Sequence, residues 1–122
     1  MSERIKLLYV DDEPTNLILF EHNFNKHFDI ITAESGKQGL EILKKNPQTK
    51  VVISDMRMPE MSGLEFIKTA KGEFPTKKYY ILTGYEITPD ISEAIKGNIV
   101  TNCFSKPFNK QEIEDSIAES LN

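Results

Sequence analysis

Acidic side chains, a hydroxyl and an ammonium group stand at four separate places in the chain, each after a short apolar run. Asp11 and Asp12 follow the first run, and Asp55 follows the third. Thr83 follows the fourth run and Lys106 the fifth. Three carboxylates held within a few ångströms repel one another, and one takes up a proton unless a cation is bound among them. Carboxylate oxygens are hard ligands of the kind that Mg²⁺ prefers, so these residue types suit magnesium-assisted phosphoryl transfer.

In such chemistry each of these side chains has a defined part. A bound Mg²⁺ leaves one carboxylate oxygen of Asp55 free to attack phosphorus and screens the charge of the incoming group. Lys106 supplies a second positive charge, and the hydroxyl of Thr83 can donate a hydrogen bond to a phosphoryl oxygen. Taken singly, the same residue types are typical of helix caps, turns and solvated surface cations. Their joint placement after four apolar runs favours the chemical interpretation.

The apolar runs themselves predict strands. They are short and rich in Ile, Val, Tyr and Phe, which favours strands over buried helices. Between and after them, apolar residues recur at steps of three and four, which predicts helices. Ile113, Ile117 and Leu121 show this spacing in the last segment. The five expected strands are Ile5–Val10, Phe28–Thr32, Val51–Ser54, Tyr79–Leu82 and Val100–Phe104.

Residues with strong helix-boundary preferences separate these segments. Pro14 suits the first turn of a helix, and Gly97 suits the end of one. Ser35, Ser62 and Thr88 are typical N-cap residues. Strand–helix alternation repeated five times predicts an α/β fold with a parallel sheet covered by helices on both faces. Sites in such sheets form at the carboxyl ends of the strands, where the strand order reverses, and the acidic residues stand at strand ends.

The composition is that of one ordinary globular domain. The chain has 122 residues, of which 39% are hydrophobic and 28% charged, which predicts a single domain spanning residues 1–122. The net charge of -4 argues against non-specific binding to nucleic acid or to a membrane surface. No apolar stretch approaches the roughly 20 residues needed to cross a bilayer. Because Cys103 is the only cysteine and no signal peptide is evident, we expect a cytoplasmic protein without an internal disulfide.

The segments that carry these residues resemble, in order and in spacing, the signature segments of response-regulator receiver domains in two-component systems. The matching segments are Val10–Pro14, Asp55–Pro59, Ser62-Gly63, Thr83-Gly84 and Phe104–Phe108. The resemblance covers essentially the whole chain. It implies a flavodoxin-like, doubly wound sandwich with a five-stranded parallel sheet in the order 2-1-3-4-5, as in chemotaxis regulators. It also implies a phosphoacceptor switch in a phosphorelay rather than an enzyme that turns over a substrate.

The resemblance assigns a role to each residue of the site. It makes Asp55 the phosphoacceptor and Asp12 a direct Mg²⁺ ligand. Asp11 would act mainly through a metal-bound water, and the backbone carbonyl of Arg57 would also bind the ion. Lys106 would pair with the phosphoryl group.

The resemblance further implies how the signal enters and leaves. A sensor histidine kinase or a phosphotransfer protein would donate the phosphoryl group. Thr83 and Phe104 would form a switch pair, in which the aromatic ring turns inward after phosphorylation. The pair would act on the surface of the fourth helix, fifth strand and fifth helix, where a downstream partner or output domain binds. Contact with nucleic acid or membrane is not expected. The Lys106–Pro107 bond would be cis, and Arg57 and Tyr85 would border the path of a hydrolytic water.

Two other protein classes share parts of this pattern. A phosphatase of the haloacid-dehalogenase type also uses an Asp nucleophile beside Mg²⁺, but after its first strand it has a second Asp two positions later. Here Asp11 and Asp12 are adjacent, and position 13 is Glu. A flavin carrier of the flavodoxin type needs a hydroxyl- and Gly-rich phosphate loop after the first strand, where these acids would repel phosphate. The phosphatase is therefore the main alternative.

Overall fold

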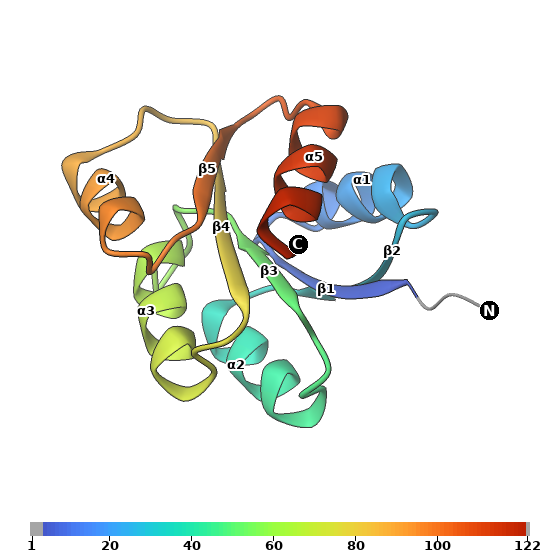
Figure 1. Ribbon diagram of the computed structural model, residues 1–122, viewed down its shortest axis with the longest axis horizontal. Helices are drawn as coiled ribbons and strands as arrows, with labels where there is room; N and C mark the ends of the chain where they lie inside the picture. Colours follow the sequence, from blue (N-terminus) through green and yellow to red (C-terminus); the bar gives the residue numbers. More distant parts are fainter. Residues whose placement is uncertain (1–3, 122) are drawn as a thin grey trace.

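The computed structural model describes residues 4–121, in which five strands alternate with five helices (Figure 1). The strands are β1 (Ile5–Val10), β2 (Phe28–Ala33), β3 (Val51–Ser54), β4 (Lys78–Thr83) and β5 (Asn102–Ser105). The helices are α1 (Pro14–Phe24), α2 (Gly36–Lys45), α3 (Gly63–Glu73), α4 (Pro89–Lys96) and α5 (Lys110–Leu121). Neighbouring strands pair in parallel in the order β2-β1-β3-β4-β5. The expected doubly wound α/β fold is confirmed.

Alternation along the strands builds a separate core on each face of the sheet. On β1, Leu7 and Tyr9 belong to the core that α1 and α5 cover, whereas Leu8 and Val10 belong to the core under α2, α3 and α4. Figure 1 shows the same division, with α1 and α5 on one side of the sheet and α2 and α3 on the other. Because side chains of one strand alternate between faces, nearly continuous apolar runs are required, as the sequence has.

Two strand boundaries differ from the expected ones in a way that matters for the site. Thr83 is the last residue of β4 rather than the first residue after it. β5 begins at Asn102 rather than Val100, because the residues before it close the end of α4. The N–H groups of Ile99 and Val100 donate to the carbonyl of Ala94 at 2.9 and 3.1 Å. The expected helix starts at Pro14, Ser35, Ser62 and Thr88 are all confirmed.

The start of α3 is tied to the end of β3 by its capping residues and by a glycine. Ser62 Oγ accepts from Glu65 N–H at 3.1 Å, and the Glu65 carboxylate accepts from Ser62 N–H at 2.9 Å. The N–H of Gly63 donates to Met56 O at 2.8 Å. A Cβ atom at Gly63 would lie 2.0 Å from the backbone carbonyl oxygen of Asp55. Only glycine therefore allows this helix to begin directly against Asp55.

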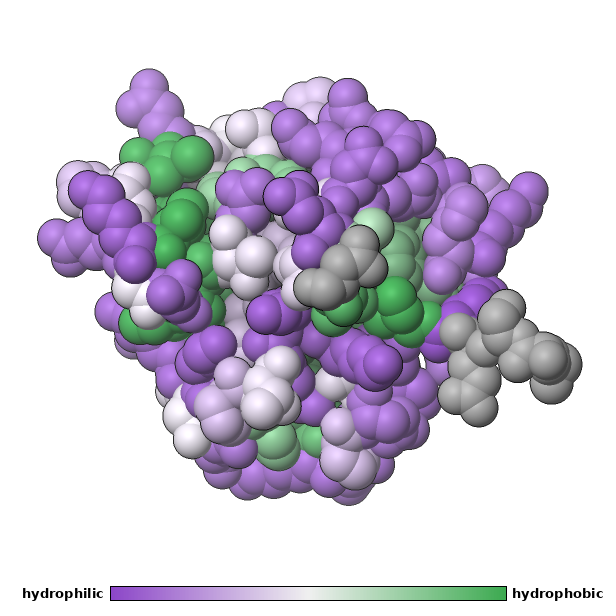
Figure 2. Space-filling model, in the orientation of Figure 1, coloured by the Kyte–Doolittle hydropathy of each residue, from purple (hydrophilic) through white to green (hydrophobic). Residues whose placement is uncertain are grey.

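The surface in Figure 2 is mostly hydrophilic, with hydrophobic residues gathered on the left, in the region of α4. Ile18 and Leu19 on α1 and Ile87 before α4 are among the exposed large hydrophobic residues. Within residues 4–121, none of the helices combines the length and the apolar character that crossing a bilayer requires.

Candidate functional site

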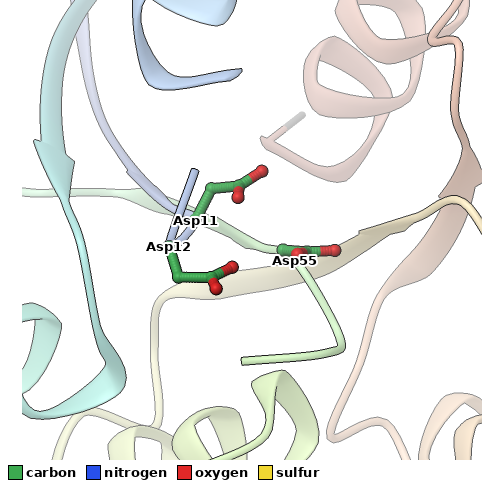
Figure 3. Close-up of side chains that lie close together, drawn as sticks. All are labelled: Asp11, Asp12 and Asp55. Atoms are coloured by element: carbon green, nitrogen blue, oxygen red, sulfur yellow. The ribbon is translucent and has the colours of Figure 1, made fainter. Parts of the chain in front are cut away.

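Three carboxylates gather at the carboxyl ends of β1 and β3. Asp11 and Asp12 follow β1 and Asp55 follows β3, and each offers an oxygen within 4.8 Å of the others. Figure 3 shows the three side chains grouped, with their carboxylates extending to the same side. β1 and β3 are adjacent in the sheet, which brings residues 43 positions apart or more into one cluster. The convergence predicted from the sequence is confirmed for these three residues.

Asp11 is completely buried, and both of its carboxylate oxygens accept hydrogen bonds. Tyr9 OH donates to Oδ2 at 2.7 Å, and the N–H of Glu13 donates to Oδ1 at 3.0 Å. Lys106 Nζ also donates to Oδ2, at 3.1 Å. Glu13 is the N-cap of α1 and makes no side-chain cap bond, so the acidic pair does not serve as the cap of this helix.

Asp55 lines the cluster and is only 8% exposed. Its Oδ1 accepts from the N–H of Met56 at 2.9 Å and lies 3.2 Å from Lys106 Nζ. Burial raises the pKa of the Asp55 carboxyl, and the negative charge of Asp11 raises it further. The Lys106 ammonium and the Met56 N–H lower it, but not enough to cancel the effect of burial. The site thus holds a carboxylate whose charge its protein neighbours only partly compensate.

Lys106 bridges two of the carboxylates. Its ammonium lies 3.1 Å from Asp11 and 3.2 Å from Asp55. Burial disfavours the charge of Lys106, but Asp55 and Asp11 outweigh burial, so its pKa is raised and it stays a cation. The Lys106–Pro107 bond is cis, as expected from the resemblance. The backbone N–H of Lys106 donates to Thr83 O at 2.8 Å, which joins this loop to the end of β4.

Thr83 and Phe104 lie on the adjacent strands β4 and β5, but their side chains face opposite sides of the sheet. Phe104 pairs with Leu82, and Ser105 with Thr83, in the parallel register. The Thr83 hydroxyl oxygen accepts from the N–H of Tyr85 at 3.1 Å. Phe104 is 2% exposed, and its ring stacks on Tyr80 with centroids 5.3 Å apart. The Phe104 ring packs in the core under α1 and α5, whereas Thr83 lines a pocket with Ile91 of α4, so the structure does not bring the two side chains of the expected switch pair together.

Arg57 and Tyr85 stack on each other at the rim of the site. The guanidinium carbon of Arg57 lies 3.8 Å from the centre of the Tyr85 ring, although the two residues belong to different loops. Both line a cleft of about 400 Å³ whose walls include Asp12, Asp55 and Lys106. The two residues therefore border the space in front of Asp55, as the resemblance implied.

The residues of this cluster fit a hard divalent cation. The donors are carboxylate oxygens, which Mg²⁺ prefers, and their mutual repulsion is a force that a cation relieves. Among residues 4–121, Lys106 makes the ion pairs of this cluster, and even with Arg57 at the rim two positive charges face three carboxylates and Glu13, so a net negative charge remains in the cleft. The acidic cluster can therefore hold a metal ion.

Tyr9 is a site residue that the interpretation of the sequence did not include. It is 1% exposed, and its ring packs in the core under α1. Burial, followed by the charge of Asp11, raises the pKa of Tyr9, so its hydroxyl remains protonated and acts as a donor. Strand alternation could have identified it, because residues two apart on β1 point to the same face.

Comparisons with known proteins agree with this architecture. The profile of the response regulator receiver domain matches residues 7–118. The chain is 33% identical to a chemotaxis protein CheY homolog of Campylobacter jejuni, over 96% of this chain and 92% of the relative. It is also 33% identical to sporulation initiation phosphotransferase F of Bacillus subtilis, over 95% and 93%. A response regulator receiver domain protein from Clostridium thermocellum superposes with a TM-score of 0.89 at 30% identity, over 97% and 94% of the two chains. These similarities extend over nearly the whole chain and not over a single motif.

Proposed function

The chain belongs to the response regulator receiver domain family, and we propose that Asp55 is the residue on which it accepts a phosphoryl group. A receiver domain is a signalling phosphoacceptor of two-component systems rather than a catalytic enzyme, and a histidine kinase is its partner. Membership of this family excludes the phosphatase alternative. The observation that carries the assignment to Asp55 is its position in the acidic cleft, beside both other acids and in contact with Lys106.

We propose Mg²⁺ as the ion of the acidic cluster. Asp12 and Asp55 would bind it directly, Asp11 through water, and the backbone carbonyl of Arg57 would add a ligand. When bound, the ion supplies positive charge that neutralises the carboxylates and the incoming phosphoryl group. The fit of hard oxygen donors to a hard cation supports this choice over softer transition metals, which favour His and Cys ligands.

Three residues of the chain take part in the transfer itself, each in a different role. An Asp55 carboxylate oxygen forms the new bond to phosphorus as the bond between phosphorus and the donor's histidine nitrogen breaks. Lys106 stays charged beside this carboxylate and pairs with a phosphoryl oxygen. The hydroxyl of Thr83 turns from the N–H of Tyr85 to a second phosphoryl oxygen. Asp55 and Lys106 are placed in advance by the strand end and the loop that carry them, and only the hydroxyl of Thr83 has to turn.

For output, we propose that Thr83 couples phosphorylation to the surface formed by α4, β5 and α5, without direct contact with Phe104 of the expected pair. Thr83 ends β4 and lines a pocket with Ile91 of α4, whereas Phe104 lies on the edge strand β5 and faces α1 and α5. Because Phe104 is already buried against Tyr80, an inward rotation of its ring is not required. Loss of the Thr83 contact to Tyr85 would instead release the loop that leads into α4. A downstream partner or output domain would then recognise the altered surface.

The assignment of the acceptor is tested by incubating the protein with acetyl phosphate and Mg²⁺ and following its intact mass. We expect the wild type to gain one phosphoryl group, and Asp55→Asn to gain none. Excess chelator should also abolish uptake. Asp90→Asn, which removes an exposed acid on α4, is the matched control and should be phosphorylated like the wild type. Uptake by Asp55→Asn, or undiminished uptake in chelator, would contradict the proposal.

A further inference from the structure

Tyr9 contacts the acidic cluster from inside the protein, through a bond to Asp11. We propose that Tyr9 is a positioning residue that holds the Asp11 carboxylate in the orientation in which the three acids bind a divalent cation. The hydroxyl donates to Asp11 Oδ2 at 2.7 Å, and both side chains are shielded from solvent, at 1% and 0% exposure. The inference rests on the proposed Mg²⁺ site and adds a residue to it that touches neither the ion nor the phosphoryl group.

The aromatic core holds the phenol in place. The ring of Tyr9 stacks on Phe20 of α1, with centroids 4.1 Å apart and planes inclined by 13°. Phe20 in turn contacts Phe24 and Phe108, with centroids 4.5 and 6.0 Å away. A ring packed between a strand and a helix has little rotational freedom, so its hydroxyl is a donor at a fixed position. The orientation of the Asp11 carboxylate is therefore set by a residue of the buried core rather than by the loop that follows Asp11.

The same hydroxyl affects how Lys106 divides its contacts. Tyr9 OH and Lys106 Nζ share Asp11 Oδ2, while Lys106 also contacts Asp55 at 3.2 Å. Without the phenol, Lys106 would be the remaining donor to a fully buried oxygen and would be drawn toward Asp11. Asp11 would also lose one of two fixed donors that set its orientation. Both changes disturb the arrangement of the three carboxylates, and loss of an outer hydrogen-bond partner commonly weakens metal binding about 10- to 100-fold.

Tyr9→Phe tests this role because it removes the hydroxyl and retains the stacked ring. Tyr80→Phe is the matched control: it removes a phenol from the same core, where the hydroxyl contacts Ser116 O and Ser120 Oγ on α5. We expect calorimetric titration with Mg²⁺ to show at least tenfold weaker binding for Tyr9→Phe and wild-type binding for Tyr80→Phe. Thermal unfolding should show that both variants are folded at the temperature of the titration.

A second measurement needs no substitution. In protein carrying ¹³C at the tyrosine ζ carbon, the Tyr9 resonance should move on addition of Mg²⁺ with the same midpoint as the amide of Asp12. The Tyr80 resonance should stay unchanged. Equal Mg²⁺ affinity in Tyr9→Phe and the wild type, tighter binding in the variant, or a Tyr9 resonance indifferent to Mg²⁺ would each overturn the positioning role. Absence of Mg²⁺ binding by the wild type would instead overturn the proposed metal site, and this inference with it.

Discussion

Asp55 and Lys106 both have raised pKa values, and the two shifts have different causes. At Asp55, loss of water disfavours the carboxylate more than the ammonium of Lys106 favours it. At Lys106, burial opposes the charge, but the carboxylates of Asp55 and Asp11 outweigh it. The pair therefore places a permanent cation beside an acceptor whose charge is only partly compensated. Binding of a further cation would neutralise the remaining negative charge. Phosphoryl transfer to a carboxylate needs such neutralisation, because the incoming group is also negative.

The stack of Arg57 and Tyr85 is the residue-scale feature that bears on the lifetime of the phosphoryl group. Both side chains line the cleft in front of Asp55. Hydrolysis needs a water in line with the bond that breaks, on the side facing this cleft. A guanidinium packed on an aromatic ring is less mobile than either side chain alone, since the cation–π contact contributes about 0.5–1 kcal/mol at an exposed site. We therefore expect the pair to shield the phosphoryl group.

The double substitution Arg57→Ala with Tyr85→Ala should shorten the lifetime of the aspartyl phosphate by about tenfold, if shielding adds ~1.4 kcal/mol to the barrier. Tyr85→Phe keeps the ring under the guanidinium and should leave the lifetime close to that of the wild type. The phosphorylated fraction can be timed by intact mass after the donor is removed, with thermal melts to check folding. An equal or longer lifetime in the double variant would show that these side chains do not exclude water.

At the scale of elements, the start of α3 and the end of β3 act as one unit. The capping box of Ser62 and Glu65 fixes where the helix begins, and Gly63 N–H holds the loop through Met56 O. The Asp55 carbonyl lies directly against Gly63. The backbone that carries the acceptor is thus packed on a helix terminus. Displacing the helix should displace Asp55 as well.

Replacing glycine by alanine at two positions of α3, Gly63 and Gly72, should change the free energy of unfolding in opposite directions. Gly63→Ala places a Cβ 2.0 Å from the Asp55 carbonyl oxygen, so the helix must shift, at a cost of about 1–3 kcal/mol. Gly72→Ala meets nothing within 4 Å and should raise the free energy of unfolding by about 0.5–1 kcal/mol. Urea unfolding measures both, and acetyl phosphate should label Gly63→Ala more slowly than Gly72→Ala. Changes of stability with the same sign would show that the close approach at Gly63 does not constrain the helix.

At the scale of the whole molecule, charge is distributed unevenly along the chain. Residues 1–85 carry twelve acidic and twelve basic side chains, whereas residues 86–122 carry seven acidic and three basic ones. The net charge of -4 therefore falls in the part that builds α4, β5 and α5. Phosphate backbones bind clusters of Lys and Arg, so an acidic output surface is consistent with a partner other than nucleic acid.

The buried negative charge of Asp55, which its neighbours only partly compensate, should also lower the stability of the whole fold. Burial raises the pKa of Asp55 above 3.8, so between 3.8 and the raised value the folded protein holds a proton that the unfolded chain has released. The free energy of unfolding then falls as the pH rises through this window. Asp55→Asn lacks the charge and should be more stable than the wild type at pH values above the window. The difference should shrink as the pH approaches 3.8, and Mg²⁺ should reduce it at neutral pH.

Urea unfolding in chelator, at a series of pH values from about 4 to 8, measures this difference. Glu41→Gln, which neutralises an exposed acid on α2, is the control and should follow the wild type. A wild type that is as stable as Asp55→Asn at neutral pH without Mg²⁺ would mean that Lys106 fully compensates the buried carboxylate.

The architecture and most of the site could be predicted from the amino-acid sequence. Short apolar runs and helical spacing are local signals, and parallel strands carry their carboxyl ends to one edge of the sheet, so the sequence is enough to predict that Asp11, Asp12 and Asp55 lie together. Caps such as Ser62 and Thr88 are local as well, because they bond to residues three positions away. Roles specific to a family, such as that of Lys106, required the resemblance of ordered segments.

Features that depend on contacts between distant residues could not be predicted in this way. β5 begins later than predicted because the N–H groups of Ile99 and Val100 donate to the carbonyl of Ala94 at the end of α4. Strand propensity takes no account of such bonds. The stack of Arg57 on Tyr85 and the inward position of Phe104 depend on how separate loops and strands pack. The contribution of Tyr9 to the site depends on Lys106, which lies 97 positions further along the chain. Both residues donate to the same oxygen of Asp11. The local sequence pattern determines which face of the sheet a side chain lies on. The residue that it contacts there depends on how distant segments of the chain pack together.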